Sequence, residues 1–169
     1  MYNKGNERGR QDISRGTPTH EDTKKIIDDA RKFIIGENID PESLLGYDGS
    51  VRKFADSKPD KNDTKSHQLR RFYSDIVDIW ELAEKSSGDQ NNPDVSKLRI
   101  RLAMMEARMN YAKERGVLSG NIFELLRECV STVNRETGKK WIESLERFRT
   151  FFEAFVAYSY KGSEKHGGY

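Results

Sequence analysis

The chain has 169 residues and a formal net charge of +2, and 34% of its residues are charged and 34% hydrophobic. A typical globular domain is only about a quarter charged, so this composition favours slender helices with wide solvated faces over a deep α/β core. The single cysteine, Cys129, excludes an intrachain disulfide, and no apolar run approaches the roughly 18 residues of a membrane span. The first residues also lack the apolar segment of a secretory signal, so we expect a cytoplasmic protein.

Both ends of the sequence are polar and poor in residues that a core can bury. Residues 1–18 contain four glycines or prolines and four basic residues, and residues 161–169 read KGSEKHGGY. Such segments bury too little apolar surface to offset the entropy lost on ordering. The sequence therefore predicts a disordered or partner-ordered arm at 1–18, one helical-bundle domain at 19–160 and a flexible tail at 161–169.

The first half of the predicted domain begins with a well-marked helix. Thr19 is its expected N-cap and Gly36 its expected end, and the apolar residues between them recur at helical spacing. Asp40-Pro41 is typical of the cap and first position of a second, short element. A further short helix is expected to end before Pro59.

The second half shows three longer helical patterns. The first surrounds Trp80, and the second is expected to run from Pro93 to Gly116. A capping-box-like pattern at 121–124 predicts the start of the next helix, and Gly138 separates it from the last one. No segment alternates with the two-residue period of a strand. The expected fold is all-α, a single-domain up-and-down bundle of five to six helices.

Familiar signatures of catalytic and cofactor sites are missing from the sequence. It contains no GxGxxG, GxxxxGK[ST], HExxH or CxxC motif and no Glu-x-x-His pair. Cys129 lies on an apolar stripe, where a buried structural thiol is the expected state. His67 has no identifiable acid or metal partner, which makes it a poor candidate for a nuclease base. We therefore predict no enzyme, no cofactor and no metal.

Positive charge is concentrated first at the start of the Trp80 helix. Lys65, Arg70 and Arg71 lie there with no acidic residue from position 64 to 73. A helix N-terminus offers free N–H groups and the positive end of the helix dipole, and both favour a phosphate. These three residues are therefore predicted to bind RNA.

A second basic cluster forms a stripe along the helix that is expected after residue 93. At about 100° per residue, four cations fall within about 40° of one another: Lys97, Arg101, Arg108 and Arg115. Tyr111 lies beside them. Such a stripe matches a phosphate backbone, and the tyrosine ring is suited to stacking on a base or ribose. A solvated face is the ordinary alternative for a run of charge.

Three segments of the sequence resemble one protein family. TKSHQLRRFY at 64–73 resembles the Ser/Thr-x-x-Gln-hydrophobic-Arg-basic-Phe-aromatic helix of the small subunit (Csm family) of the type III-A CRISPR-Cas effector complex. LRIRLAMMEAR at 98–108 and FEAFVAYSY at 152–160 are similar to the later motifs of that family, in the same order. The sequence departs from the family at Ile100, where proline is frequent, and at Met104, where tyrosine is frequent.

The resemblance implies a non-catalytic helical subunit that acts in antiviral defence. Several copies are expected to line up along the guide RNA–target RNA duplex, beside the Csm backbone subunit and the large subunit, which carry out target cleavage and signalling. By motif match, the RNA-facing positions are Gln68, Arg70, Arg71, Arg99, Arg101 and Arg108. Helical spacing disfavours Arg99, because it lies on the other side of the buried face.

Charge is distributed unequally along the chain. Residues 21–48 hold eight acidic and four basic residues, whereas residues 97–115 hold six basic and two acidic ones. Copies that repeat along a filament meet through two different patches. An acidic surface near the first helix is therefore expected to face the basic rim of a neighbouring copy.

Three other functions remain open at this point. The chief alternative is a helical protein–protein interaction module without nucleic-acid binding, which predicts no salt-dependent RNA binding. A small nuclease using His67 predicts turnover by the purified protein. A sequence-specific DNA-binding protein is disfavoured, because the basic stripe has few side chains that read base edges.

Overall fold

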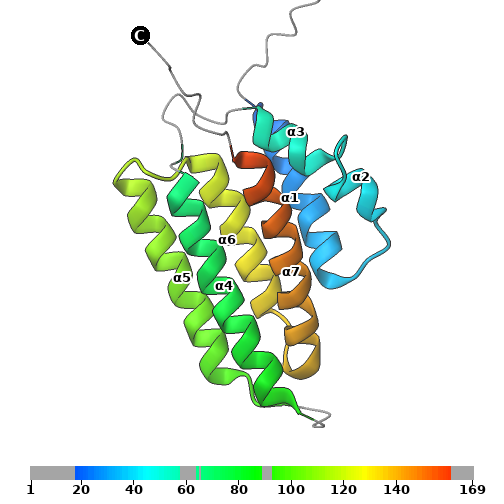
Figure 1. The fold of residues 1–169 in the computed structure, drawn as a ribbon, viewed down its shortest axis with the longest axis vertical. Helices are drawn as coiled ribbons and strands as arrows, with labels where there is room; N and C mark the ends of the chain where they lie inside the picture. The colour runs from blue at the N-terminus through cyan, green and yellow to red at the C-terminus, as the bar shows by residue number, and fades with distance from the viewer. Residues whose placement is uncertain (1–17, 58–63, 65, 89–92, 161–169) are drawn as a thin grey trace, which may run out of the picture.

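The computed structural model describes residues 18–57, 64, 66–88 and 93–160, and this part of the chain contains seven α-helices and no strand. The helices are α1 (His20–Ile35), α2 (Pro41–Leu45), α3 (Ser50–Asp56), α4 (Ser66–Ser87), α5 (Ser96–Glu114), α6 (Gly120–Asn134) and α7 (Gly138–Ser159). Five long helices form the bundle, and the short α2 and α3 lie at one flank (Figure 1). The predicted all-α bundle is confirmed, and the described residues contain seven helices where five to six were expected. The predicted tail, Lys65 and the predicted arm before Pro18 lie outside the described residues.

Helix α1 begins and ends where local chemistry predicts. The Thr19 side chain accepts a hydrogen bond from the Asp22 N–H at 3.1 Å, and the Asp22 carboxylate accepts one from the Thr19 N–H at 2.9 Å. This reciprocal pair is a capping box, and its hydrogen bonds hold the pKa of Asp22 below the ordinary value. At the other end, Gly36 takes a left-handed conformation with φ 78°. Both predicted ends of this helix are confirmed.

Two helix starts differ from the sequence-based expectation. Helix α5 begins at Ser96 instead of Pro93, because the Asp94 carboxylate accepts the Ser96 N–H at 3.0 Å and the residues before it are not helical. The cap of α6 is Ser119, whose side chain accepts from the Ile122 N–H at 3.2 Å. The helix start predicted at 121–124 is therefore wrong by two residues, because the side chain that accepts the free N–H at the start of α6 is that of Ser119.

Helix α7 carries most of the aromatic core. It packs against α1, α3, α4 and α6, and it buries Trp141, Phe148, Phe151, Phe152 and Phe155. Cys129 of α6 is also fully buried, and desolvation raises its pKa far above the usual range of a thiol. The thiol therefore stays protonated, and the predicted buried structural cysteine is confirmed. No helix among the described residues is both long and apolar enough to cross a membrane.

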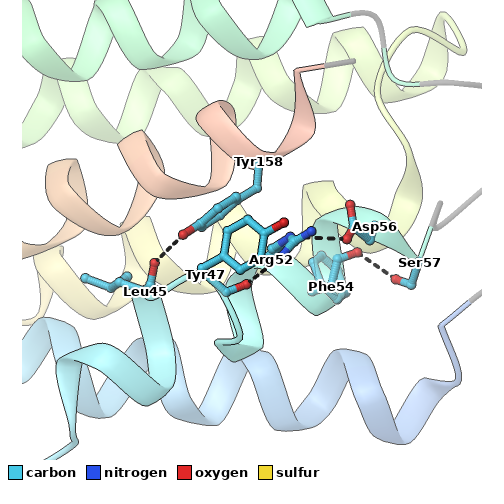
Figure 2. Close-up of polar contacts among 7 residues, drawn as sticks. All are labelled: Leu45, Tyr47, Arg52, Phe54, Asp56, Ser57 and Tyr158. Atoms are coloured by element: carbon cyan, nitrogen blue, oxygen red, sulfur yellow. Dashed lines mark hydrogen bonds and ion pairs between the residues drawn. The ribbon is translucent and has the colours of Figure 1, made fainter. Parts of the chain in front are cut away.

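The short helices α2 and α3 are tied to the end of α7 (Figure 2). The Tyr158 hydroxyl donates a hydrogen bond to the Leu45 carbonyl oxygen at 2.9 Å. The Arg52 guanidinium donates to the Tyr47 carbonyl at 3.0 Å, lies 3.5 Å from the centroid of the Tyr47 ring, and is 3.6 Å from the Asp56 carboxylate. These contacts join α2 to the end of α7 and hold Arg52 against the turn between α2 and α3.

Candidate nucleic-acid interface

Helices α4 and α5 lie side by side at one edge of the bundle (Figure 1). The Ser119 N–H donates to the Thr64 hydroxyl oxygen at 2.8 Å, which places the start of α4 beside the end of α5. The two helices are therefore antiparallel. As a result, the basic residues at the start of α4 lie near the Arg115 end of the basic residues of α5.

The predicted cations of α5 form an exposed line, called here the basic line: Lys97, Arg101, Arg108 and Arg115. A groove of about 320 Å³ separates part of this line from α4. It is lined by Asp75, Ile79, Ile100, Arg101, Met104 and Arg108. The groove is therefore bordered by two cations of the basic line, one carboxylate and three apolar side chains.

One cation of the basic line has a partner on α4. The Arg108 guanidinium lies 3.5 Å from the carboxylate of Asp75. Spacing along α5 alone does not predict this acidic neighbour, because Asp75 belongs to another helix. The positive charge of the groove is therefore partly neutralised near its middle.

The predicted residues of α4 divide between its two sides. Asp75 follows Gln68 by seven residues and Arg71 by four, so the three side chains share the α5-facing side of α4. Arg70 is exposed on the other side, where its guanidinium lies 4.9 Å from the ring centroid of Tyr160 after α7. The structure therefore groups Arg71 and Gln68 with the basic line and separates Arg70 from it.

Tyr111 and Arg99 occupy opposite sides of α5. Tyr111 is exposed, and the Arg115 guanidinium lies 5.5 Å from the centroid of its ring, so ring and cation form one platform. Arg99 is half-buried and donates to the Asn134 carbonyl at 2.5 Å. This bond joins α5 to α6. The geometry agrees with the helical spacing, which disfavoured Arg99 as an RNA contact.

A family model for Csm2 of type III-A matches residues 47–163, which is 117 of the 169 residues (163 − 47 + 1). The chain belongs to the Csm2 family. It is thus a small subunit of the type III-A Csm complex, and the resemblance seen in the sequence is confirmed. No curated protein and no solved structure shows a significant match. The matched region includes all of α3 to α7 and begins after α1 and α2.

The motifs that indicated the Csm2 family pack against one another. The rings of Tyr73 and Phe152 meet edge to face, with centroids 6.0 Å apart, and Arg70 lies over the Tyr160 ring. Tyr73 and Arg70 belong to the first motif, and Phe152 and Tyr160 to the third. Much of the recognisable pattern therefore encodes the contact between α4 and α7, and only part of it faces the groove.

Two exposed residues of α5 were missed as site candidates. Ile100 and Met104 are large, apolar and solvent-facing, and they lie four residues apart on the outer side of the helix. In the sequence they stood out only as departures from the family pattern. Helical spacing could have identified them, because both positions lie on the side of α5 away from its buried face, where large apolar residues are not expected. No group of three or more potential metal ligands occurs in the described parts of the chain.

Proposed function

We propose that this Csm2-family subunit is a non-catalytic RNA-binding component of its complex. In this proposal, several cytoplasmic copies line up along the guide RNA–target RNA duplex and contact the target RNA backbone. The other partners are the Csm backbone subunit and the large subunit. The observation that carries the proposal is the exposed basic line of α5, with Arg71 of α4 on the side of that helix that faces it.

The length and charge of the basic line suit a single RNA strand. From Lys97 to Arg115 it spans about 27 Å at about 1.5 Å per residue, which is enough for several consecutive phosphates. Each neutralised phosphate releases counterions, and this release supplies most of the affinity of such a contact. Tyr111 lies within reach of a base or ribose beside the line. Because the line has few base-edge readers, binding is expected to be independent of sequence.

The α4–α5 groove presents two arginines that can bind RNA phosphates. Arginine guanidinium groups bind phosphate oxygens through fixed pairs of N–H donors. Arg101 and Arg108 both border the groove, and both are exposed, so their guanidinium groups are accessible to a phosphate. In the proposed role, the subunit holds RNA in place while the chemistry is carried out by other subunits of the complex.

A salt titration tests the proposal. Fluorescence anisotropy of a labelled single-stranded RNA, measured at increasing salt, should give a log K that falls by about 0.7 per phosphate contact for each tenfold rise in salt. Two to five contacts are expected, and RNAs of unrelated sequence should bind alike. A flat salt response or no binding would favour the interaction module without nucleic acid. Sequencing the RNA that copurifies with the native complex should return repeat-derived guides.

A further inference from the structure

The outer edge of α5 carries three exposed apolar side chains, which we call the apolar ridge: Ile100, Met104 and Tyr111. Their exposed fractions are 65%, 57% and 64%. The buried face of the same helix contains Leu102, Met105 and Met109, so the ridge projects nearly opposite the core. Helix α5 therefore has two apolar faces. One is buried in the core, and the other is exposed to solvent.

An RNA backbone does not explain the aliphatic part of this ridge. Phosphates and riboses are recognised by cations, hydroxyls and aromatic rings, whereas Ile100 and Met104 offer none of these. Contiguous exposed apolar side chains mark protein interfaces, and methionine and arginine are enriched in such interfaces. The ridge lies beside the basic line. A protein partner for it must therefore combine apolar anchors with negative charge.

The chain itself presents such a surface at its other flank. Residues 33–51 contain four acidic residues and no lysine or arginine. The same stretch has two exposed apolar side chains, and we call its exposed acidic and apolar residues together the acidic corner: Ile35, Glu37, Asp40, Glu42, Tyr47 and Asp48. Ile35 is 42% exposed and Tyr47 is 69% exposed. The corner thus has the apolar anchors and the charge that the ridge requires.

Tyr47 is held ready for a contact in the isolated subunit. Arg52 covers one face of its ring at 3.5 Å and is itself fixed by Asp56 and by the Tyr47 carbonyl (Figure 2). A side chain that is already ordered loses little entropy on binding, so it is a favourable anchor. The rest of the Tyr47 side chain remains exposed to solvent.

The ridge and the corner lie on opposite flanks of the bundle (Figure 1). Helix α5 packs on α4 and α6, whereas α2 packs on α3, beyond α1 and α7. We propose that the apolar ridge of one copy packs against the acidic corner of the next copy. The contact joins two different surfaces, so it extends into a row and does not close into a dimer. This inference rests on the proposed function, because it names the surfaces by which the proposed row of copies forms.

Site-directed crosslinking tests the contact directly. One full-length variant carries Tyr47→Cys and a second carries Met104→Cys. Native Cys129 is fully buried and is not expected to react. A short bismaleimide should join the two variants when they are mixed in the reconstituted complex, and neither variant should crosslink alone. A chain with both cysteines should give a ladder of dimers, trimers and longer products. Glu143→Cys, exposed on α7 and outside both surfaces, serves as the matched control.

The outcomes separate the possible occupants of the ridge. A product from Met104→Cys alone shows a two-fold contact and overturns the proposal. Absence of the mixed product in a complex that retains its RNA also overturns it, and assigns the ridge to RNA or to another subunit.

The apolar anchor and the RNA role are tested separately. Ile35→Gln added to the Tyr47→Cys variant should reduce the mixed product at least about fivefold while the RNA affinity of the isolated protein stays within about twofold, because Ile35 does not border the α4–α5 groove. A mixed product that Ile35→Gln leaves unchanged would show that the acidic corner is not the docking surface and would overturn the proposal. If the crosslink forms but the isolated protein binds no RNA, the proposed function fails and the copy contact stands.

Discussion

Arg108 of α5 and Asp75 of α4 form an ion pair across the groove that carries the predicted RNA contacts, with 3.5 Å between guanidinium nitrogen and carboxylate oxygen. The Arg108 side chain is 50% exposed and that of Asp75 is 27% exposed. A phosphate that approaches Arg108 must therefore compete with a carboxylate that also repels it. The pair makes the middle of the basic line its weakest part as an RNA contact.

Replacing Asp75 with asparagine should strengthen RNA binding. Removal of the carboxylate frees Arg108 and removes one repulsive charge, so we expect a rise in affinity of about three- to tenfold and a steeper salt dependence, by about 0.7 in slope. The fold should tolerate the change, because exposed ion pairs contribute only about 0–1 kcal/mol to stability. Anisotropy titrations at several salt concentrations measure both effects.

The matched control for this change is Asp78→Asn. Asp78 is exposed on α4, three residues further along, and its loss changes the net charge equally. It should raise RNA affinity less than Asp75→Asn does. Equal effects of the two variants would show that overall charge, and not the release of Arg108, sets the affinity.

Sequence reasoning located the basic line but not its acidic neighbour, and the reason is physical. Helical spacing gives the angle of a side chain about its own axis, which suffices to place Arg101 and Arg108 on one exposed line. It does not give the rotation of α4 against α5, on which the Asp75 contact depends. Helical spacing also separates Arg70 from Arg71 by about 100°, but it does not show which of them faces α5.

The helix ends show where local chemistry is decisive. Thr19 and Gly36 were predictable because their capping contacts involve residues at most four positions away. The cap at Ser119 was missed, although it is equally local, because Asn121 has the glutamate three residues later that a capping box requires, whereas Ser119 has Ile122 at that position. Exposed Ile100 and Met104 follow no rule of folding. In the proposed row of copies, the neighbouring copy covers them.

A double charge reversal tests the basic line itself. Arg101→Glu with Arg108→Glu should reduce RNA affinity at least about tenfold, because two phosphate contacts become repulsive. Both side chains are exposed, so the helical content by circular dichroism should be unchanged. Loss of folding would show that these residues support the bundle instead of a ligand.

The control for this reversal keeps the net charge equal. Lys24→Glu with Lys32→Glu changes two exposed cations of α1, away from the α4–α5 pair. This variant should retain most of the RNA affinity. An equal loss in both variants would mean that RNA responds only to the total charge of the subunit.

Truncation of Phe152 tests the aromatic core that joins the family motifs. Its ring is fully buried, with centroids 5.9 Å from Phe148, 6.4 Å from Phe155 and 6.0 Å from Tyr73. Phe152→Ala should lower the free energy of unfolding by about 3–5 kcal/mol, since it leaves a large cavity. Urea denaturation measures the change. Ile100→Ala, at an exposed position, should change stability by no more than about 0.5 kcal/mol. A small effect of Phe152→Ala would mean that the helices repack around the gap.

The turn after α1 provides a last test, because it depends on a glycine. Gly36 has φ 78°, and a Cβ at this position would lie 2.8 Å from Nη2 of Arg147. The same guanidinium donates to the Ile34 carbonyl at 3.0 Å and so fastens the end of α1 to α7. Gly36→Ala should therefore lower the free energy of unfolding by at least about 1 kcal/mol, through backbone strain and displacement of Arg147.

Gly120→Ala is the matched control for this substitution. Gly120 is the first residue of α6, its φ is not in the left-handed region, and nothing lies within 4 Å of the added Cβ. The change should stabilise the protein by about 0.4–1 kcal/mol, because alanine restricts the unfolded chain. Both variants should bind RNA as the unmodified protein does, since neither residue belongs to the proposed RNA contacts. If Gly36→Ala is as stable as Gly120→Ala, the end of α1 moves freely and the Arg147 contact does not hold it.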